Sequence, residues 1–166
     1  MANEKLTEQA CSVARSASLI GDPWSLLIIR EALAGNRRFS DFVEFTGAQP
    51  SVVSDRLKRL VAAGVLRSSQ YQDHPPRNEY RLTPMGRALQ PVLIALSNWG
   101  DEFLDNGHGA PLVYIHEGCG QPAHPQMTCT HCGDSVDAHS LRVIPGPGAD
   151  PDNVARRVSH ATRSTD

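Results

Sequence analysis

Two short motifs with similar spacing bring together residues that could bind a metal. The segment His116-Glu117-Gly118-Cys119-Gly120 is echoed by Cys129-Thr130-His131-Cys132-Gly133. Each motif places two ligands three positions apart and follows the second with glycine, which is the spacing of a zinc knuckle. Three thiolates and one imidazole complete the tetrahedral shell that zinc prefers. The pattern therefore predicts a Zn²⁺ site made of His116, Cys119, Cys129 and Cys132.

The identity of the fourth ligand stays open, because His124, His131 and His139 lie in the same segment. The alternative is a set of reduced thiols without a metal. A shell filled by four protein ligands leaves no position for water or substrate, so we expect a structural site and no enzyme activity. The segment has few large apolar side chains, and metal binding would supply its folding free energy.

Composition sets the limits for the rest of the chain. Its 166 residues are 40% hydrophobic and 20% charged, enough for one domain with a small appendage. The net charge of -2 gives no global signal for nucleic acid or membrane, so any such signal must be local. No secretory signal or membrane-spanning apolar run is visible, and we expect a cytoplasmic, reducing location where cysteines bind metals or act in redox chemistry.

Composition also divides the chain into three regions. We expect a body over residues 7–105 and a zinc-ribbon-like module over residues 110–144. A tail over residues 145–166 begins Pro-Gly-Pro-Gly and is expected to be disordered.

The body shows the start and stop signals of several helices. They are a helix over 11–20, a second from Asp22 as N-cap to Gly35, a short third from Ser40 as N-cap to Gly47 with Phe42, Val43 and Phe45 inward, and a fourth over 50–63. Two helices separated by a turn that contains glycine are typical of a helix-turn-helix.

A hairpin and a long helix follow. The β-prone runs 65–71 and 78–83 are joined by a polar tip that is stiffened by proline. A long helix then begins at Thr83-Pro84 and carries apolar residues at helical spacing as far as Phe103. The expected fold is mainly α (α+β): a winged helix-turn-helix with flanking dimerisation helices and a small C-terminal zinc-knuckle module.

The helix over 50–63 has the two faces that a recognition helix needs. Val53, Leu57, Leu60 and Val61 share one arc, which is expected to face the core. The opposite arc would offer small or polar groups to base edges and cations to phosphates. We therefore predict a double-stranded DNA interface formed by Ser51, Val52, Asp55, Lys58 and Arg59, with Arg56 on its flank.

Local charge supports the same interpretation. Residues 56–87 contain seven Lys or Arg against two acidic residues, a net charge of +5. Arg77 at the hairpin tip is expected to enter a minor groove. The alternative is an amphipathic helix with a solvated basic face. The role of Asp55 stays open: its carboxylate could accept a hydrogen bond from a cytosine amino group or pair with Arg59.

Several motifs in the same order resemble the HxlR-type family of bacterial transcription regulators within the MarR-like superfamily. They are the run from Asp22-Pro23-Trp24 to Arg30, then Arg38-Phe39-Ser40-Asp41-Phe42, Ser54 to Leu60, Tyr80 to Gly86, and Trp99-Gly100. The resemblance implies a homodimer that reads a palindromic or near-palindromic operator, with half-sites about one helical turn apart. We expect this regulator to act as a repressor.

The resemblance also raises a role for Cys11. In HxlR-like regulators a cysteine at this N-terminal position is sometimes a redox sensor, whereas a plain core role is the alternative. A second functional hypothesis is therefore a redox- or small-molecule-responsive receptor, whose thiol state or ligand controls the release of DNA.

Overall fold

The computed structural model describes residues 4–123, 125–137 and 139–150. The chain divides into two compact units, one of residues 19–125 and the other of residues 1–18 with 126–166. Most of the expected tail, residues 151–166, lies outside the described residues. In the part of the chain that is described, no helix is long and apolar enough to cross a membrane.

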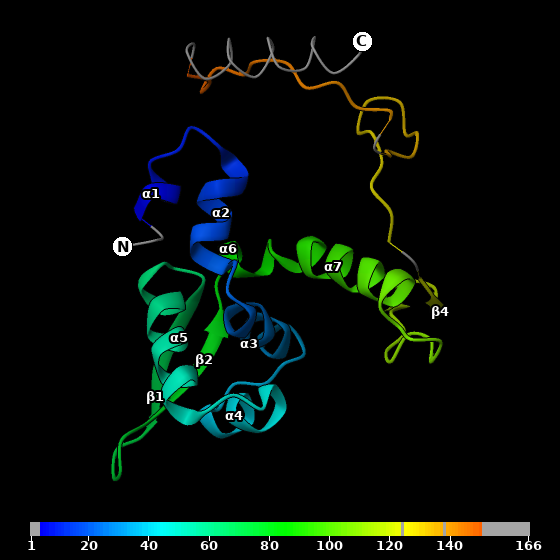
Figure 1. Cartoon of the computed structure of the whole chain (residues 1–166). Helices are drawn as coiled ribbons and strands as arrows, with labels where there is room; N and C mark the ends of the chain where they lie inside the picture. Colours follow the sequence, from blue (N-terminus) through cyan, green and yellow to red (C-terminus); the bar gives the residue numbers. More distant parts are fainter. Residues whose placement is uncertain (1–3, 124, 138, 151–166) are drawn as a thin grey trace. The chain divides into compact units, whose positions relative to one another are not determined.

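The larger unit has the element order of a winged helix-turn-helix (Figure 1). Its elements are α3 (Pro23–Leu33), α4 (Phe39–Thr46), α5 (Pro50–Ala62), β1 (Leu66–Gln72), β2 (Arg77–Leu82), α6 (Pro84–Arg87), α7 (Gln90–Phe103), β3 (Ile115–His116) and β4 (Gln121–Pro122). Near the N-terminus lie α1 (Glu4–Thr7) and α2 (Ser12–Ile20), the latter ending within the larger unit. The predicted fold class is thus confirmed for the winged-helix part.

Local signals explain where the helices begin. Asp22 caps α3 by accepting from the backbone N–H of Ser25 at 3.1 Å, and Pro50 at the first position of α5 needs no N–H partner. The expected start of α4 was wrong. Its N-cap is Arg38, whose backbone N–H donates to the Asp41 carboxylate at 3.1 Å, while the Ser40 hydroxyl donates to that same carboxylate.

The core lies where α3, α4 and α5 pack on the base of the hairpin. The predicted inward face of α5 is confirmed, because three of its four residues are fully buried and Val61 is half-buried against them. The predicted inward face of α4 is wrong for Phe45, which is exposed, while Phe42 is buried and Val43 is half-buried against the core. The fully buried apolar side chains of the core are Ile28, Ile29, Phe42, Val53, Leu57, Leu60, Val65 and Leu66.

The hairpin β1–β2 is the wing. Its strands are antiparallel, with Leu66 opposite Leu82 and a bulge between Gln70 and Gln72. The residues just before α4 pair with the other edge of β2. The Tyr80 backbone N–H donates to the Arg37 carbonyl at 2.8 Å. The wing is thereby fixed against the start of the helix-turn-helix.

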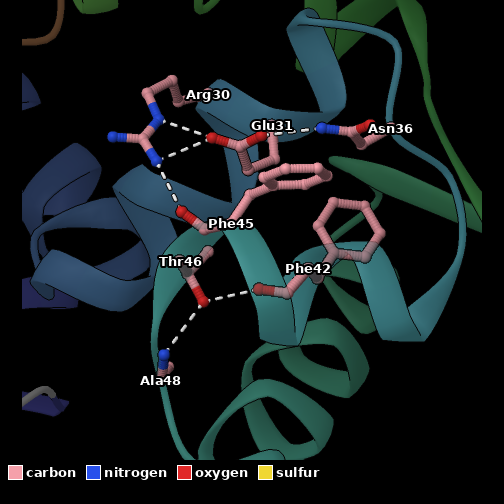
Figure 2. Close-up of polar contacts among 7 residues, drawn as sticks. All are labelled: Arg30, Glu31, Asn36, Phe42, Phe45, Thr46 and Ala48. Atoms are coloured by element: carbon pink, nitrogen blue, oxygen red, sulfur yellow. Dashed lines mark hydrogen bonds and ion pairs between the residues drawn. The ribbon is translucent and has the colours of Figure 1, made fainter.

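A polar network fixes α3 against the end of α4 (Figure 2). The buried carboxylate of Glu31 accepts from Arg30 and from Asn36, both at 2.7 Å. Arg30 also donates to the Phe45 carbonyl at 3.1 Å. At the turn itself, the Thr46 hydroxyl donates to the Phe42 carbonyl and accepts from the Ala48 N–H. These contacts connect α3, α4 and the turn that leads into α5.

The expected single long helix from Pro84 to Phe103 is two helices. Pro91 has no N–H to donate to the Arg87 carbonyl four residues earlier, and the chain turns through Ala88 and Leu89 between α6 and α7. The break lets α6 pack closely on the wing while α7 extends beyond it.

We expect Gly86→Ala to lower the free energy of unfolding by about 1–3 kcal/mol. A Cβ at Gly86 would overlap the Val65 carbonyl oxygen and lie 2.7 Å from a Leu82 methyl carbon. The first neighbour is backbone and cannot rotate away. Chemical denaturation of the purified variant measures the effect.

Gly100→Ala is the matched control. It makes the same change within α7, where a Cβ would meet nothing within 4 Å, and it should raise stability by about 0.4–1 kcal/mol. A Gly86→Ala variant as stable as the wild type would contradict this close packing of α6 on the wing.

Candidate nucleic-acid interface

The face of α5 that points away from the core carries most of the predicted DNA contacts. Ser51, Asp55, Lys58 and Arg59 are exposed there. Val52 is half-buried and packs against the core, so its side chain is only partly available at the surface. A helix with polar groups near its N-terminus and cations further along can lie in a major groove.

Arg56 has a different setting from the other cations of α5. Its Nε donates to Asp22 at 2.8 Å, and its guanidinium also pairs with Asp55. The Arg56 side chain is 23% exposed. It therefore joins α5 to the N-terminus of α3. Asp55, for which a pairing with Arg59 was one hypothesis, pairs with Arg56 instead.

This ion pair shifts the pKa values of both partners. Burial acts to raise the pKa of Asp22, but hydrogen bonds from Ser25 and Arg56 outweigh it and hold that pKa below its ordinary value of 3.8. The hydrogen bond to Asp22 raises the pKa of Arg56. The charged forms of both side chains are thus stabilised in the folded protein.

Asp22→Asn should therefore reduce stability at neutral pH and have little effect in acid. Asparagine still caps α3 but loses the charge facing Arg56, a cost of about 1 kcal/mol. Because the folded-state pKa of Asp22 lies below 3.8, its contribution is present above that pH and is lost as the pH falls through the folded-state pKa. Denaturant unfolding of both proteins across pH measures the difference.

Asp73→Asn in the wing is the control for this prediction. Asp73 is exposed and accepts one hydrogen bond from Gln70, which an asparagine can also accept, so stability should change by less than about 0.5 kcal/mol. If the difference in free energy of unfolding between the wild type and Asp22→Asn stayed constant into acid, the charge of Asp22 would not be its cause.

Arg77 is exposed at the start of β2, opposite Gln72, rather than at the tip of the loop. It lines a cleft of about 450 Å³ between the wing and the start of α4. In this cleft the Arg38 guanidinium lies 5.5 Å from the centre of the Tyr71 ring. The lining residues are Arg38, Phe39, Ser40, Tyr71, Pro76, Arg77, Asn78 and Tyr80.

Arg38 and Tyr71 are candidate contact residues that the sequence reasoning missed. The adjacent basic pair Arg37-Arg38 just before α4 was the available signal. Part of the local positive charge is compensated, since Arg81 donates to Glu79 at 2.8 Å. That hydrogen bond is the main cause of the lowered pKa of Glu79.

The four predicted metal ligands form two local pairs. In the larger unit, His116 Nδ1 lies 3.3 Å from Cys119 Sγ. In the other unit, backbone N–H groups of Cys132 and His131 lower the pKa of the Cys129 thiol. Within each unit, the described residues contain no group of three or more metal-ligating side chains. His124 lies outside the described residues.

With this geometry in place, comparison with known proteins identifies the family. The model for HxlR-like helix-turn-helix proteins matches residues 19–108, more than half of the 166 residues. The chain belongs to the HxlR-like helix-turn-helix family. Like its relatives, it is a transcriptional regulator and not an enzyme.

Individual relatives extend the likeness. The chain is 42% identical over 137 residues to the uncharacterised HTH-type transcriptional regulator Rv3095 of Mycobacterium tuberculosis, covering 82% of this chain and 87% of that protein. Because the alignment covers 82% of the chain, it includes residues 116–133 whatever its first residue is.

Two solved structures show the same fold. PA1607, described as a candidate transcription factor, matches with a TM-score of 0.76 at 32% identity, over 86% of this chain and 99% of that one. The redox regulator HypR in its oxidised form matches with a TM-score of 0.52 at 28% identity, over 55% of this chain and 96% of that one.

Proposed function

We propose that this HxlR-like regulator is a homodimeric repressor that reads a near-palindromic operator. The observation that carries the proposal is the exposed face of α5, which presents Lys58 and Arg59 beyond a fully buried apolar face. In each protomer α5 enters a major groove, and Arg77 of the wing reaches the adjacent minor groove.

Within α5, the contacts divide by position. Ser51, near the N-terminus, approaches base edges, while Lys58 and Arg59 hold phosphates. Val52 lies at the margin of this face and is half-buried, whereas Asp55 lies within the face and pairs with Arg56. Arg56 acts mainly by orienting α5 through Asp22.

An exposed apolar stripe on α7 is an argument for the proposed dimer. Leu93 packs on the core, whereas a stripe at helical spacing on another face stays exposed, including Trp99 and Phe103, whose rings lie 5.8 Å apart. An exposed apolar stripe of this kind is typical of an association surface. The stripe consists of Val92, Leu96, Trp99 and Phe103.

Selection of bound sequences from a random duplex library tests the proposal. The wild-type chain should enrich an inverted repeat with half-sites about one helical turn apart. Arg59→Ala should weaken binding to all sequences alike and reduce the salt slope by about one. Arg142→Ala removes the same charge from an exposed position outside the winged unit and should bind as the wild type does.

A second candidate function is redox control of DNA release, which the likeness to the redox regulator HypR favours. Cys11 is half-buried just before α2, and its carbonyl accepts from the Arg15 N–H at 3.0 Å. Affinity for the selected duplex, measured with and without oxidant, tests this function. Oxidation should weaken binding by the wild type but not by Cys11→Ser.

A further inference from the structure

Backbone contacts fix the cleft between the wing and the start of α4. Arg38 forms a β-bridge with Glu79 of β2, and the Tyr80 N–H donates to the Arg37 carbonyl at 2.8 Å. Tyr71 is the extra residue of the bulge in β1 and lines the cleft. A bulge can re-aim a side chain in this way. All lining residues belong to the larger compact unit, so the cleft is a feature of the winged-helix fold itself.

The cleft contains two arginines that no carboxylate neutralises. None of its lining residues is acidic. Elsewhere on the larger unit, Arg30, Arg56 and Arg81 each have a carboxylate partner. In the part of the chain that the structure describes, no ion pair joins Arg38 or Arg77 to a carboxylate. Two positive charges in a concave space attract an anion.

The carboxylates next to the lining residues in sequence are engaged elsewhere. Asp41 accepts from the Arg38 backbone N–H and from the Ser40 hydroxyl, both at 3.1 Å. Glu79 accepts from Arg81 at 2.8 Å. Neither carboxylate lines the cleft. The positive charge of the cleft is therefore available to a ligand.

Aromatic side chains form much of the remaining wall. Phe39 is 36% exposed and Tyr71 is 43% exposed, and Tyr80 is half-buried. The Arg38 guanidinium lies 5.5 Å from the centre of the Tyr71 ring. A guanidinium that stacks on a ring keeps its N–H edge for a carboxylate, which it can bind through two parallel hydrogen bonds. The cleft thus places an anion-binding group beside an aromatic surface.

The size and lining of the cleft together select a class of ligand. Its volume of about 450 Å³ is within the range of small-molecule sites. We propose that the cleft binds a small aromatic carboxylate, which Arg38 and Arg77 hold by its charge while Tyr71 packs against its ring. A free phosphate or the phosphodiester of a duplex would use the two cations but not the aromatic wall.

Occupation of the cleft weakens operator binding, a consequence that rests on the proposed function. Arg77 is the wing residue that reaches the minor groove in that proposal. A carboxylate bound to Arg77 neutralises this cation and removes it from the DNA. The aromatic carboxylate is therefore an effector that favours release of the operator.

Calorimetric titration of the full-length chain with benzoate tests the site without DNA. Benzoate should bind once per chain. Benzamide, which has the ring without the charge, and inorganic phosphate, which has charge without a ring, should each bind at least about tenfold more weakly. Arg38→Ala should lower the affinity for benzoate by about tenfold or more, and Tyr71→Ala should lower it as well.

Arg67→Ala is the matched control for these variants. It removes the same charge from an exposed position on the same hairpin, outside the cleft, and it should bind benzoate as the wild type does. Absence of saturable benzoate binding, or binding that is unchanged in Arg38→Ala, would overturn the proposal. Phosphate bound as tightly as benzoate would overturn it too and assign the cleft to the DNA backbone.

Titration of the selected duplex tests the effector role separately. Benzoate should weaken duplex binding by the wild type, whereas benzamide should not. Equal duplex affinity with and without saturating benzoate would overturn the effector role. A chain that selects no duplex would contradict the proposed function, while the calorimetric result for the cleft would still stand.

Discussion

Phe42→Ala should lower the free energy of unfolding by about 3–5 kcal/mol. The Phe42 side chain is fully buried, and its ring meets that of Tyr80 edge to face at 6.1 Å. Removing it leaves a cavity where α4 packs on the wing. Because Tyr80 lies on β2, the loss should also loosen the wing against the helix-turn-helix.

Phe45→Ala is the control, since it makes the same change on the same helix. Phe45 is 52% exposed, and its contact with Arg30 is made by the backbone, so the loss should stay below about 1 kcal/mol. Chemical denaturation of the two variants measures the difference. Equal losses would show that Phe42 is not the centre of this core.

If the chain forms the proposed homodimer through α7, Trp99→Asp should convert that dimer to a monomer and weaken operator binding on the order of a hundredfold. Trp99 is 55% exposed on α7, and a carboxylate in the middle of an apolar interface would be buried without a partner. Linking two half-site contacts in one dimer multiplies affinity by about 10²–10⁴, which a monomer forfeits. Sedimentation and duplex titration measure the two effects.

Val143→Asp introduces the same charge at a site that is 94% exposed outside α7, and it should remain dimeric. Circular dichroism of Trp99→Asp should match the wild type, because this side chain contributes little to the fold of one protomer. A dimeric Trp99→Asp would place the association surface elsewhere on the chain.

Much of the winged-helix fold follows from local sequence signals. Glycine, proline and capping residues mark the ends of α3 and α5 within one or two residues, and the apolar spacing of α5 predicts Val53, Leu57 and Leu60 as buried. Pro91 carries the signal for the break between α6 and α7, but the apolar spacing that continues past it favoured one helix.

The candidate site was less predictable because its arrangement depends on contacts between distant residues. Arg56 is separated from Asp22 by 34 positions, and no local pattern indicates that the two side chains meet. Arg38 lies beside Tyr71 only because the wing pairs back onto the residues before α4. Residue type identified the basic surface, whereas tertiary packing decides which cations remain available on it.

Hydroxyl-radical footprinting on the selected duplex tests the central claim most directly. The wild type should protect two equivalent segments related by two-fold symmetry, with centres about one helical turn apart. Arg59→Ala should weaken both protections equally, and Arg142→Ala should leave both intact. A single protected segment, protection without symmetry, or a footprint unaffected by Arg59→Ala would contradict a dimer that reads DNA through α5.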